Sequence, residues 1–272
     1  MKGTLYIVST PIGNLDDITE RARRVLSSVD FVVAEDTRRT RILLNALGIR
    51  KEMMSFYQPK EQERLPLVLS RLERGESAAL VSDAGTPLVS DPGFLLVKEA
   101  VSRGIEVVPV PGPSAVLAAL VASALPSVPF SFWGYLPKGG ERIRLLESLK
   151  NRKETLVFFD SPRRIKESLK DILAVMGERN CCVAREVTKM HEEFLRGKVS
   201  EVIKLLEDRG EVKGEITLVV EGCGEGSASH HWREKALKLV DAGFSVKEAA
   251  KAVSLLFEVP KNEVYNYLVK GS

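Results

Sequence analysis

One stretch in the first half of the chain shows how the fold is built, and it reads Ala78-Ala79-Leu80-Val81-Ser82-Asp83-Ala84-Gly85-Thr86-Pro87. Residues 78–82 predict a short strand, because they begin with a run of small and apolar side chains. Ser, Asp, Gly, Thr and Pro follow at once, and these residue types favour turns and loops. The stretch therefore predicts a strand that ends in a polar loop.

The same pattern extends over the first 110 residues. Strands are also expected at 5–9, 31–34 and 106–110, with a weaker candidate at 53–56. Between the strands, helical periodicity is found at 17–28, 40–47, 61–74 and 94–103. Because strands that alternate with helices indicate a largely parallel sheet, we expect an α/β lobe over residues 1–112.

A second α/β lobe is expected over residues 113–222, after a small-residue helix at 116–124 and the chain breaks at Pro126 and Pro129. Its expected strands are 130–135, 155–159, 181–185, 193–196 and 216–221, with helices at 142–149, 164–176 and 199–208. Two strands, 181–185 and 193–196, are nearly adjacent in sequence, which indicates a mixed or antiparallel sheet.

The end of the chain is expected to form a small helical tail over residues 230–272. A Gly/Ser-rich segment, 222–229, precedes it and predicts a flexible linker. Ser245 is a plausible N-cap for a helix in this tail, and the last two helices resemble a helix-turn-helix in their spacing. Packing against a lobe and docking on RNA are both open roles for the tail.

Composition indicates a soluble globular protein, with 44% hydrophobic and 28% charged residues among 272. No apolar run approaches the roughly 20 residues of a membrane helix, and the first residues lack a secretory signal, so we expect a cytoplasmic protein with no membrane partner. A net charge of +3 does not by itself indicate a polyanionic partner. The three cysteines, 181, 182 and 223, lack zinc or redox spacing and are expected to be buried thiols. No metal site is expected.

Polar loops follow several strands of the first lobe, at 10–14, 35–38, 82–87 and 111–115. The carboxyl ends of parallel strands share one rim, and ligands bind there at the point where strand order reverses. Each loop alone is compatible with an ordinary turn, but together they favour a binding site. The loop after the first strand lacks the glycine spacing of a dinucleotide-binding turn, and no Walker motif is present.

Ordered blocks of the chain resemble the ribosomal RNA small-subunit methyltransferase I family, namely 7–19, 35–40, 82–93, 105–120, 132–137, 160–165 and 185–189. The resemblance implies a tetrapyrrole-methylase fold, with two α/β lobes, S-adenosylmethionine in the cleft between them, and usually a homodimer. It also implies a substrate, the 2′-hydroxyl of a cytidine in the decoding centre of 16S ribosomal RNA, presented as RNA or as the small ribosomal subunit. The glycine-rich opening turn and Gly-Asp-Pro loop of the wider superfamily are replaced here by 9–14 and 82–84, which favours the ribosomal branch.

The resemblance also implies which residues contact S-adenosylmethionine: Ile12, Ser82, Asp83, Gly85, Thr86, Ser114, Ala115, Phe159 and Asp160. These residue types suit the ligand. Its ammonium needs an acceptor, its carboxylate needs backbone donors, and its adenine needs an apolar wall.

Glu35 and Asp36 are the candidate bases for the 2′-hydroxyl proton. The alternative is that one of them caps the following helix and pairs with Arg38. Basic residues near the strand ends are candidate RNA contacts, and the alternative for each is a solvated helix face. They are Arg38, Arg39, Arg163, Arg164, Arg185 and Lys189.

Two other functions are compatible with the sequence. The same fold could methylate a tetrapyrrole or another small molecule, although the basic rim argues against this. A non-catalytic RNA-binding assembly factor is the other alternative, and the intact loops 82–87 and 111–115 argue against it.

Overall fold

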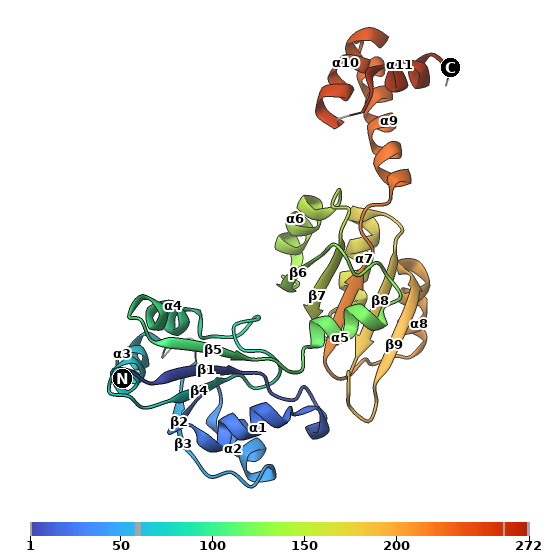
Figure 1. The fold of residues 1–272 in the computed structure, drawn as a ribbon. Helices are drawn as coiled ribbons and strands as arrows, with labels where there is room; N and C mark the ends of the chain where they lie inside the picture. The colour runs from blue at the N-terminus through green and yellow to red at the C-terminus, as the bar shows by residue number, and fades with distance from the viewer. Residues whose placement is uncertain (1, 58–60, 258, 271–272) are drawn as a thin grey trace.

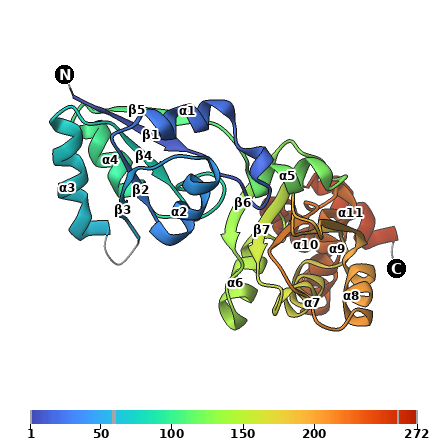
Figure 2. The ribbon, with the colours of Figure 1, turned by 90° about the horizontal axis from the view of Figure 1, so that it is seen from below.

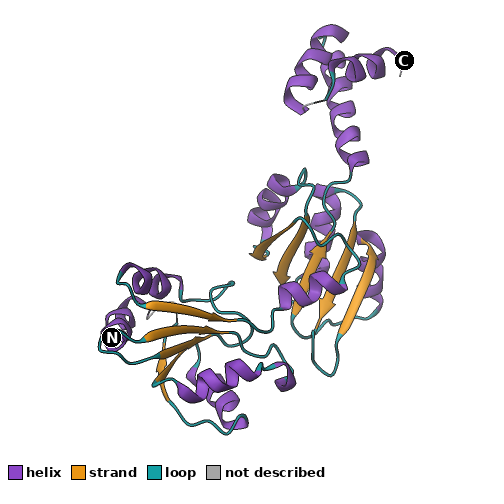
Figure 3. Ribbon diagram, in the orientation of Figure 1, coloured by secondary structure: helices purple, strands orange, loops and turns teal. Residues whose placement is uncertain are grey.

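The computed structural model describes residues 2–57, 61–257 and 259–270. It contains two α/β lobes and a helical tail that stands off from the second lobe (Figure 1). Each lobe has a sheet of its own (Figure 3). The predicted division into two α/β lobes and a C-terminal group of helices is therefore confirmed.

The first lobe is built on a five-stranded sheet of order β3-β2-β4-β1-β5, and all of its strand pairs are parallel. The expected parallel sheet is thus confirmed, and the weaker strand candidate is its edge strand β3. The strands are β1 (Thr4–Val8), β2 (Phe31–Ala34), β3 (Glu52–Ser55), β4 (Ala78–Val81) and β5 (Glu106–Val110).

Helices cover both faces of this sheet (Figure 1). On β2, Phe31 and Val33 face the cluster that contains side chains of α3 and α4, whereas Val32 and Ala34 face the cluster with α1 and α2. This alternation follows from the two-residue period of a strand and explains why the strands are almost wholly apolar. The elements are η1 (Leu15–Asp17), α1 (Glu20–Ser28), α2 (Thr37–Ala46), α3 (Glu61–Glu73) and α4 (Phe94–Ser102).

The order of the strands reverses beside β1. The chain passes from β1 outward to β2 and β3, returns to β4 between β2 and β1, and then crosses to β5 on the other side. The loops that follow β1 and β4 therefore lie next to each other at the carboxyl ends of the strands. This is the position where open α/β sheets bind ligands.

The second lobe has a mixed sheet of order β6-β7-β10-β8-β9, as the closely spaced strands predict. Only β6 and β7 are parallel among these pairs, and the others are antiparallel. The strands are β6 (Phe130–Tyr135), β7 (Thr155–Asp160), β8 (Asn180–Arg185), β9 (Glu193–Lys198) and β10 (Ile216–Val220).

The helix α5 (Ala115–Ala122) packs on the face of the second sheet that is turned toward the first lobe (Figure 2). Ile12 of the first lobe joins the same apolar cluster, together with Val116 and Val219, so this face connects the two lobes. The opposite face is covered by α6 (Gly139–Leu149), α7 (Ile165–Met176) and α8 (Val199–Asp208).

The three cysteines, 181, 182 and 223, are buried, as expected. Burial raises the pKa of Cys181 to about 12 and that of Cys182 to about 11. Both thiols lie on β8 and stay protonated at neutral pH, so they act as apolar side chains of the lobe.

The tail consists of α9 (Glu225–Asp241), α10 (Val246–Phe257) and α11 (Lys261–Lys270) around a core of its own, centred on Trp232. Ser245 and Glu248 cap α10 reciprocally, with the Glu248 amide 3.3 Å from the Ser245 hydroxyl, which confirms the expected N-cap. The expected linker differs, because α9 begins at Glu225 and takes up most of it. Extending a helix that already packs on a core costs little.

The chain leaves the second lobe as a packed segment. The Cys223 amide donates to the Arg152 carbonyl at 2.6 Å, and a side chain at Gly222 would overlap the Lys153 carbonyl. The flexible part between lobe and tail is therefore shorter than expected. No helix in the described ranges has the length and apolar character needed to cross a membrane.

Candidate functional site

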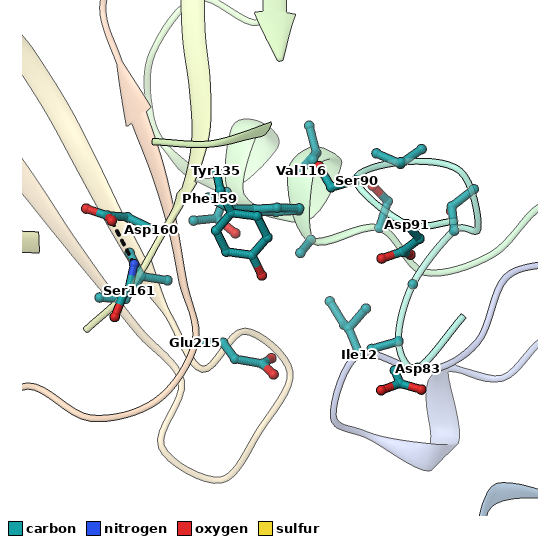
Figure 4. Close-up of a pocket in the computed structure, with 18 of the residues that line it drawn as sticks. Ile12, Asp83, Ser90, Asp91, Val116, Tyr135, Phe159, Asp160, Ser161 and Glu215 are labelled. Atoms are coloured by element: carbon teal, nitrogen blue, oxygen red, sulfur yellow. Dashed lines mark hydrogen bonds between the residues drawn. The ribbon is translucent and has the colours of Figure 1, made fainter. Parts of the chain in front are cut away.

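A cavity of about 410 Å³ lies between the two lobes, at the carboxyl ends of the first sheet. This volume is typical of small-molecule sites, which range over roughly 300–1,000 Å³. Ile12, Asp83 and Asp91 face it from the first lobe, while Tyr135 and Glu215 face it from the second (Figure 4). Both lobes are thus needed to form the site.

Hydrogen bonds hold the loops of the first lobe in fixed positions around the cavity. The backbones of Thr10 and Gly85 bond to each other in both directions, at 2.9 and 3.0 Å. The hydroxyls of Ser9 and Thr86 are 3.0 Å apart, and Thr86 also donates to the Pro113 carbonyl at 3.3 Å. The loops after β1, β4 and β5 therefore form one connected rim.

One wall of the cavity is apolar. Ile12 and Ala115 contribute to it, and Phe159 contributes an aromatic ring from the end of β7. The rings of Phe132 and Tyr135 pack against it. The distance between ring centroids is 4.9 Å to Phe132, which packs edge-on, and 5.3 Å to Tyr135, which is tilted. Such a wall suits a flat ring such as adenine.

The side of the cavity that the first lobe forms is acidic. Glu35 follows β2, and Asp83 and Asp91 belong to the loop after β4. The Asp83 carboxylate accepts from the Asp36 amide at 3.1 Å and lies 3.4 Å from the Arg39 guanidinium. Burial raises the pKa of Glu35, and the charge of Asp83 adds to this effect. Burial also raises the pKa of Asp91 to about 6, with Glu35 and Asp83 contributing.

The loop after β4 has a strained backbone. Leu88 and Ser90 have φ values of 73° and 69°, which side-chain-bearing residues rarely adopt. Gly93 ends the loop at φ 121°, and a Cβ there would lie 2.7 Å from the Leu80 side chain. Strain of this kind is commonly found at binding and catalytic sites.

The residues that the resemblance implies for the cofactor line the cavity, with the exception of Ser82. Ser82 is 4% exposed beneath the loop, and its hydroxyl donates to the Ala84 carbonyl at 3.3 Å. Asp160 borders the cavity, but its carboxylate accepts from the Ser161 amide and lies 3.4 Å from Arg164. Because the Asp160 side chain is fully buried, Asp160 can offer a ligand mainly its backbone.

The two candidate bases lie in different environments. Glu35 lines the cavity, whereas Asp36 does not. Asp36 is the N-cap of α2, accepts from the Arg38 amide at 2.8 Å and forms a 2.7 Å ion pair with the Arg38 side chain. The hydrogen bonds from Arg38 lower the pKa of Asp36 to about 2. Asp36 therefore caps the helix and pairs with Arg38, which is the alternative that the sequence left open. A carboxylate with a pKa this low is a poor proton acceptor.

The basic residues differ in how far their side chains are exposed. Arg38 and Arg39 have side chains that are 87% and 66% exposed beside the cavity, and Arg163 is exposed after β7. Arg164, Arg185 and Lys189 are only 21–26% exposed and form ion pairs with carboxylates of the second lobe. The exposed group is thus better placed to meet an external phosphate.

Lys189 also forms a contact between the lobes. Gly13 has φ 154°, and a side chain there would collide with Lys189. The ammonium of Lys189 pairs with Glu186 at 2.8 Å and with Glu215 at 3.0 Å. Its methylene stem therefore packs on the loop after β1 while its charge stays in the second lobe.

Sequence reasoning missed several residues of the cavity, notably Asp91, Tyr135 and Glu215. Asp91 has a signal, because Val89-Ser90-Asp91-Pro92-Gly93 continues the run of turn residues after Pro87. Glu215 has none, because it depends on which strands pair. Only because β10 runs antiparallel to β7 does its first residue, Ile216, lie opposite Asp160.

These residues fit S-adenosylmethionine. The ligand carries positive charge on its sulfonium and ammonium groups, which the acidic side of the cavity complements, and its adenine matches the apolar wall. Its carboxylate requires donors, which the rim backbone and the Thr86 hydroxyl can supply. In the described parts of the chain, His, Cys, Asp and Glu form no group of three that could hold a metal ion.

Comparisons with solved structures agree with this fold. A diphthine synthase matches 81% of this chain and 90% of its own, with a TM-score of 0.64 at 15% identity. A uroporphyrin-III C-methyltransferase from Thermus thermophilus, solved with S-adenyl homocysteine, matches 80% of this chain and 97% of its own, with a TM-score of 0.58 at 20% identity. Residues 4–203 match the family Tetrapyrrole (Corrin/Porphyrin) Methylases. The fold and the match define the class as that of the tetrapyrrole methylases.

Relatives in sequence narrow the class. The ribosomal RNA small subunit methyltransferase I of Thermotoga maritima is 50% identical over 81% of this chain and 99% of its own length. The protein of the same name from Halalkalibacterium halodurans is 42% identical over 97% of this chain and 94% of its own. This chain therefore belongs to the ribosomal RNA small subunit methyltransferase I family, which confirms the resemblance seen in the sequence.

Proposed function

We propose that this protein transfers a methyl group from S-adenosylmethionine to the ribose 2′-hydroxyl of a cytidine in the decoding centre of 16S ribosomal RNA. Its family makes it a methyltransferase of small-subunit ribosomal RNA. The observation that supports the finer proposal is the cavity itself, which joins an acidic side to an apolar wall and has exposed arginines beside it. We also expect a homodimer and a cytoplasmic location.

When bound, S-adenosylmethionine supplies a methyl group that is already activated by the sulfonium. The protein then has to orient the acceptor and keep water out, and alignment alone can contribute much of the rate. Ile12, Ala115 and Phe159 would hold the adenine, and Asp83 would accept from the ammonium group. Arg38 and Arg39 stand where a ribose-phosphate backbone can reach them.

The two alternative functions, methylation of a small molecule and a non-catalytic role in assembly, have less support. A tetrapyrrole would find exposed arginines near the cavity, but its own carboxylates could pair with them, so charge alone does not decide. The sequence relatives favour RNA. A non-catalytic assembly factor has no need for a cavity that matches S-adenosylmethionine in charge and size.

The experiment uses methyl-labelled S-adenosylmethionine with small subunits, naked 16S RNA and a tetrapyrrole in parallel. We expect label in small-subunit RNA at one cytidine, and resistance of the adjacent phosphodiester to alkali, because a 2′-O-methyl group blocks attack by that oxygen. Label on a base, or only on the tetrapyrrole, contradicts the proposal. Binding of S-adenosylmethionine without any transfer points to the assembly-factor alternative.

The exposed arginines provide a second test. Arg38→Ala and Arg39→Ala should lower kcat/KM for RNA methylation most at low salt, and their kcat/KM should fall less steeply than that of wild type as salt rises, because each removes a phosphate contact. Arg144→Ala, on α6 of the second lobe and outside the cavity, is the matched control. Equal methylation by all three variants across the salt series would show that Arg38 and Arg39 do not contact the RNA.

A further inference from the structure

Asp91 holds a position that the function described so far does not use. It lies in the loop after β4 and lines the cavity from the first lobe, facing Tyr135 of the second lobe (Figure 4). It is the last acidic residue before Pro92 and Gly93, where the chain turns into α4. The carboxylate thus stands at the opening between the lobes and not at the back of the first sheet.

The backbone is shaped to hold Asp91 there. Ser90, directly before it, has φ 69°, and Leu88 has φ 73°. A Cβ on Gly134 of β6 would lie 3.4 Å from the Ser90 hydroxyl, so the second lobe approaches this loop closely. A backbone that keeps two residues in an unfavourable conformation indicates that the position of the next side chain matters.

The other acids of the cavity bond to backbone amides or to basic side chains, whereas Asp91 has a hydrogen bond with the Ser82 hydroxyl. Asp83 accepts from the Asp36 amide and pairs with Arg39, and Glu35 accepts from the Asp83 amide at 3.4 Å. These contacts join the ends of β2 and β4. Asp91 takes no part in them, and the charged groups that act on it most strongly, Glu35 and Asp83, are themselves acids.

Electrostatics agree with this geometry. Burial raises the pKa of Asp91 to about 6, Glu35 and Asp83 add to the rise, and the Ser82 hydroxyl opposes it. Burial likewise raises the pKa of Tyr135, with Glu215 and Asp91 contributing. The charged groups that act on Asp91 are therefore the acids Glu35 after β2 and Asp83 after β4, and Asp91 in turn acts on the phenol of Tyr135 on β6. A carboxylate with a pKa near working pH is an efficient general base.

We propose that Asp91 is the catalytic base that accepts the proton of the RNA 2′-hydroxyl. In this step the 2′-oxygen forms a bond to the methyl carbon while the carbon–sulfur bond breaks. The sulfur keeps the bonding electron pair and becomes a neutral thioether, and the hydroxyl proton passes to the Asp91 carboxylate. The inference rests on the proposed function, because it requires a ribose hydroxyl as the acceptor.

The test compares wild type with Asp91→Asn, which keeps the shape of the side chain and removes the base. We expect methylation of small subunits to fall by about 10²-fold or more, while affinity for S-adenosylmethionine in calorimetry falls by much less than the rate. In wild type, kcat/KM should fall about tenfold per pH unit below pH 6, and this acid limb should be absent from Asp91→Asn. Asp208→Asn, at the exposed end of α8, is the matched control and should behave as wild type.

A measurement on the protein alone separates chemistry from fold. Carboxyl carbon NMR of wild type should show a resonance that titrates near pH 6 and is missing in Asp91→Asn. Asp91→Glu keeps a carboxylate and should recover part of the rate and of the fall in rate at low pH. If Asp91→Asn does not fold, Asp91→Glu is the variant that tests the proposal. Unchanged rate in Asp91→Asn, or loss of rate that merely follows loss of cofactor affinity, overturns the proposal. If wild type labels a nucleobase and not the ribose, the proposed function is contradicted, and so is the role of Asp91 as its catalytic base.

Discussion

At the scale of single residues, Asp83 and Ala115 give the sharpest test of where the cofactor binds. Both line the cavity, one with a carboxylate and the other with a methyl group. Asp83→Ala removes an acceptor and Ala115→Phe fills the space, so each should weaken S-adenosylmethionine binding at least tenfold, about 1.4–3 kcal/mol. Calorimetric titration measures this. Leu117→Phe, at a 52% exposed position of the same helix α5, is the control. Wild-type affinity in both cavity variants would falsify this placement.

The raised pKa of Asp91 also predicts a dependence of stability on pH. The folded protein holds the Asp91 proton up to about pH 6, whereas an unfolded aspartate releases it near 3.9. This carboxyl therefore favours the folded state below about pH 4 and loses that contribution as pH rises through 6. Asp91→Asn should accordingly be more stable than wild type at pH 8, by about 1–3 kcal/mol. The difference should be small at pH 4. Chemical unfolding at the two pH values checks it, and a variant less stable at pH 8 would contradict the raised pKa.

At the scale of elements, the sequence predicted what local pattern determines. The strands β2 and β5 have the expected bounds, because an apolar run between turn residues defines them. The rim loops also followed, since strand ends share one edge in a parallel sheet. The positions of Glu215 and Tyr135 could not be predicted from the sequence, because they depend on strand pairing in the second sheet. The linker was overestimated, because Gly and Ser indicate flexibility only where no neighbouring helix can extend through them.

The helix α5 predicts where two copies of the chain meet. Its outer face exposes Leu117 by 52% and Val121 by 75%, although its inner face already packs on the second sheet. Exposed apolar residues on an otherwise apolar helix favour an interface. We therefore expect Val121→Glu to shift the homodimer toward monomer, because it places a charge in a dry contact. Sedimentation velocity at several protein concentrations measures the shift. Val101→Glu, at a 60% exposed position of α4, is the control. A monomeric wild type would refute the expectation directly.

At the scale of the whole molecule, the two lobes and the tail are related in different ways. The lobes share a cavity and an apolar cluster that includes Ile12 of one lobe and Val219 of the other. The tail has a separate core, in which Trp232 and Val264 pack together with residues of the tail alone. The relative from Thermotoga maritima matches this chain over almost all of its own length yet leaves about a fifth of this chain unmatched. A fifth of the chain is about the size of the tail, and the tail is built around a core of its own.

Removing the tail is therefore a clean experiment, provided that the cut leaves the packed segment at Gly222 and Cys223 in place. A chain that ends at Gly224 should stay folded and bind S-adenosylmethionine with wild-type affinity, because neither the cavity nor the lobe cores lose a side chain. If the tail docks the substrate through exposed lysines such as Lys235 and Lys251, KM for small subunits should rise about threefold to tenfold at low salt with kcat unchanged, and the difference should narrow at high salt.

A chain that ends at Val220 provides the comparison, since it also removes the contact with Arg152 and Lys153 and should unfold at a lower temperature. Loss of cofactor binding in the chain ending at Gly224 would show that the tail belongs to the core. An unchanged KM in that chain would exclude substrate docking and leave packing or another contact as the role of the tail.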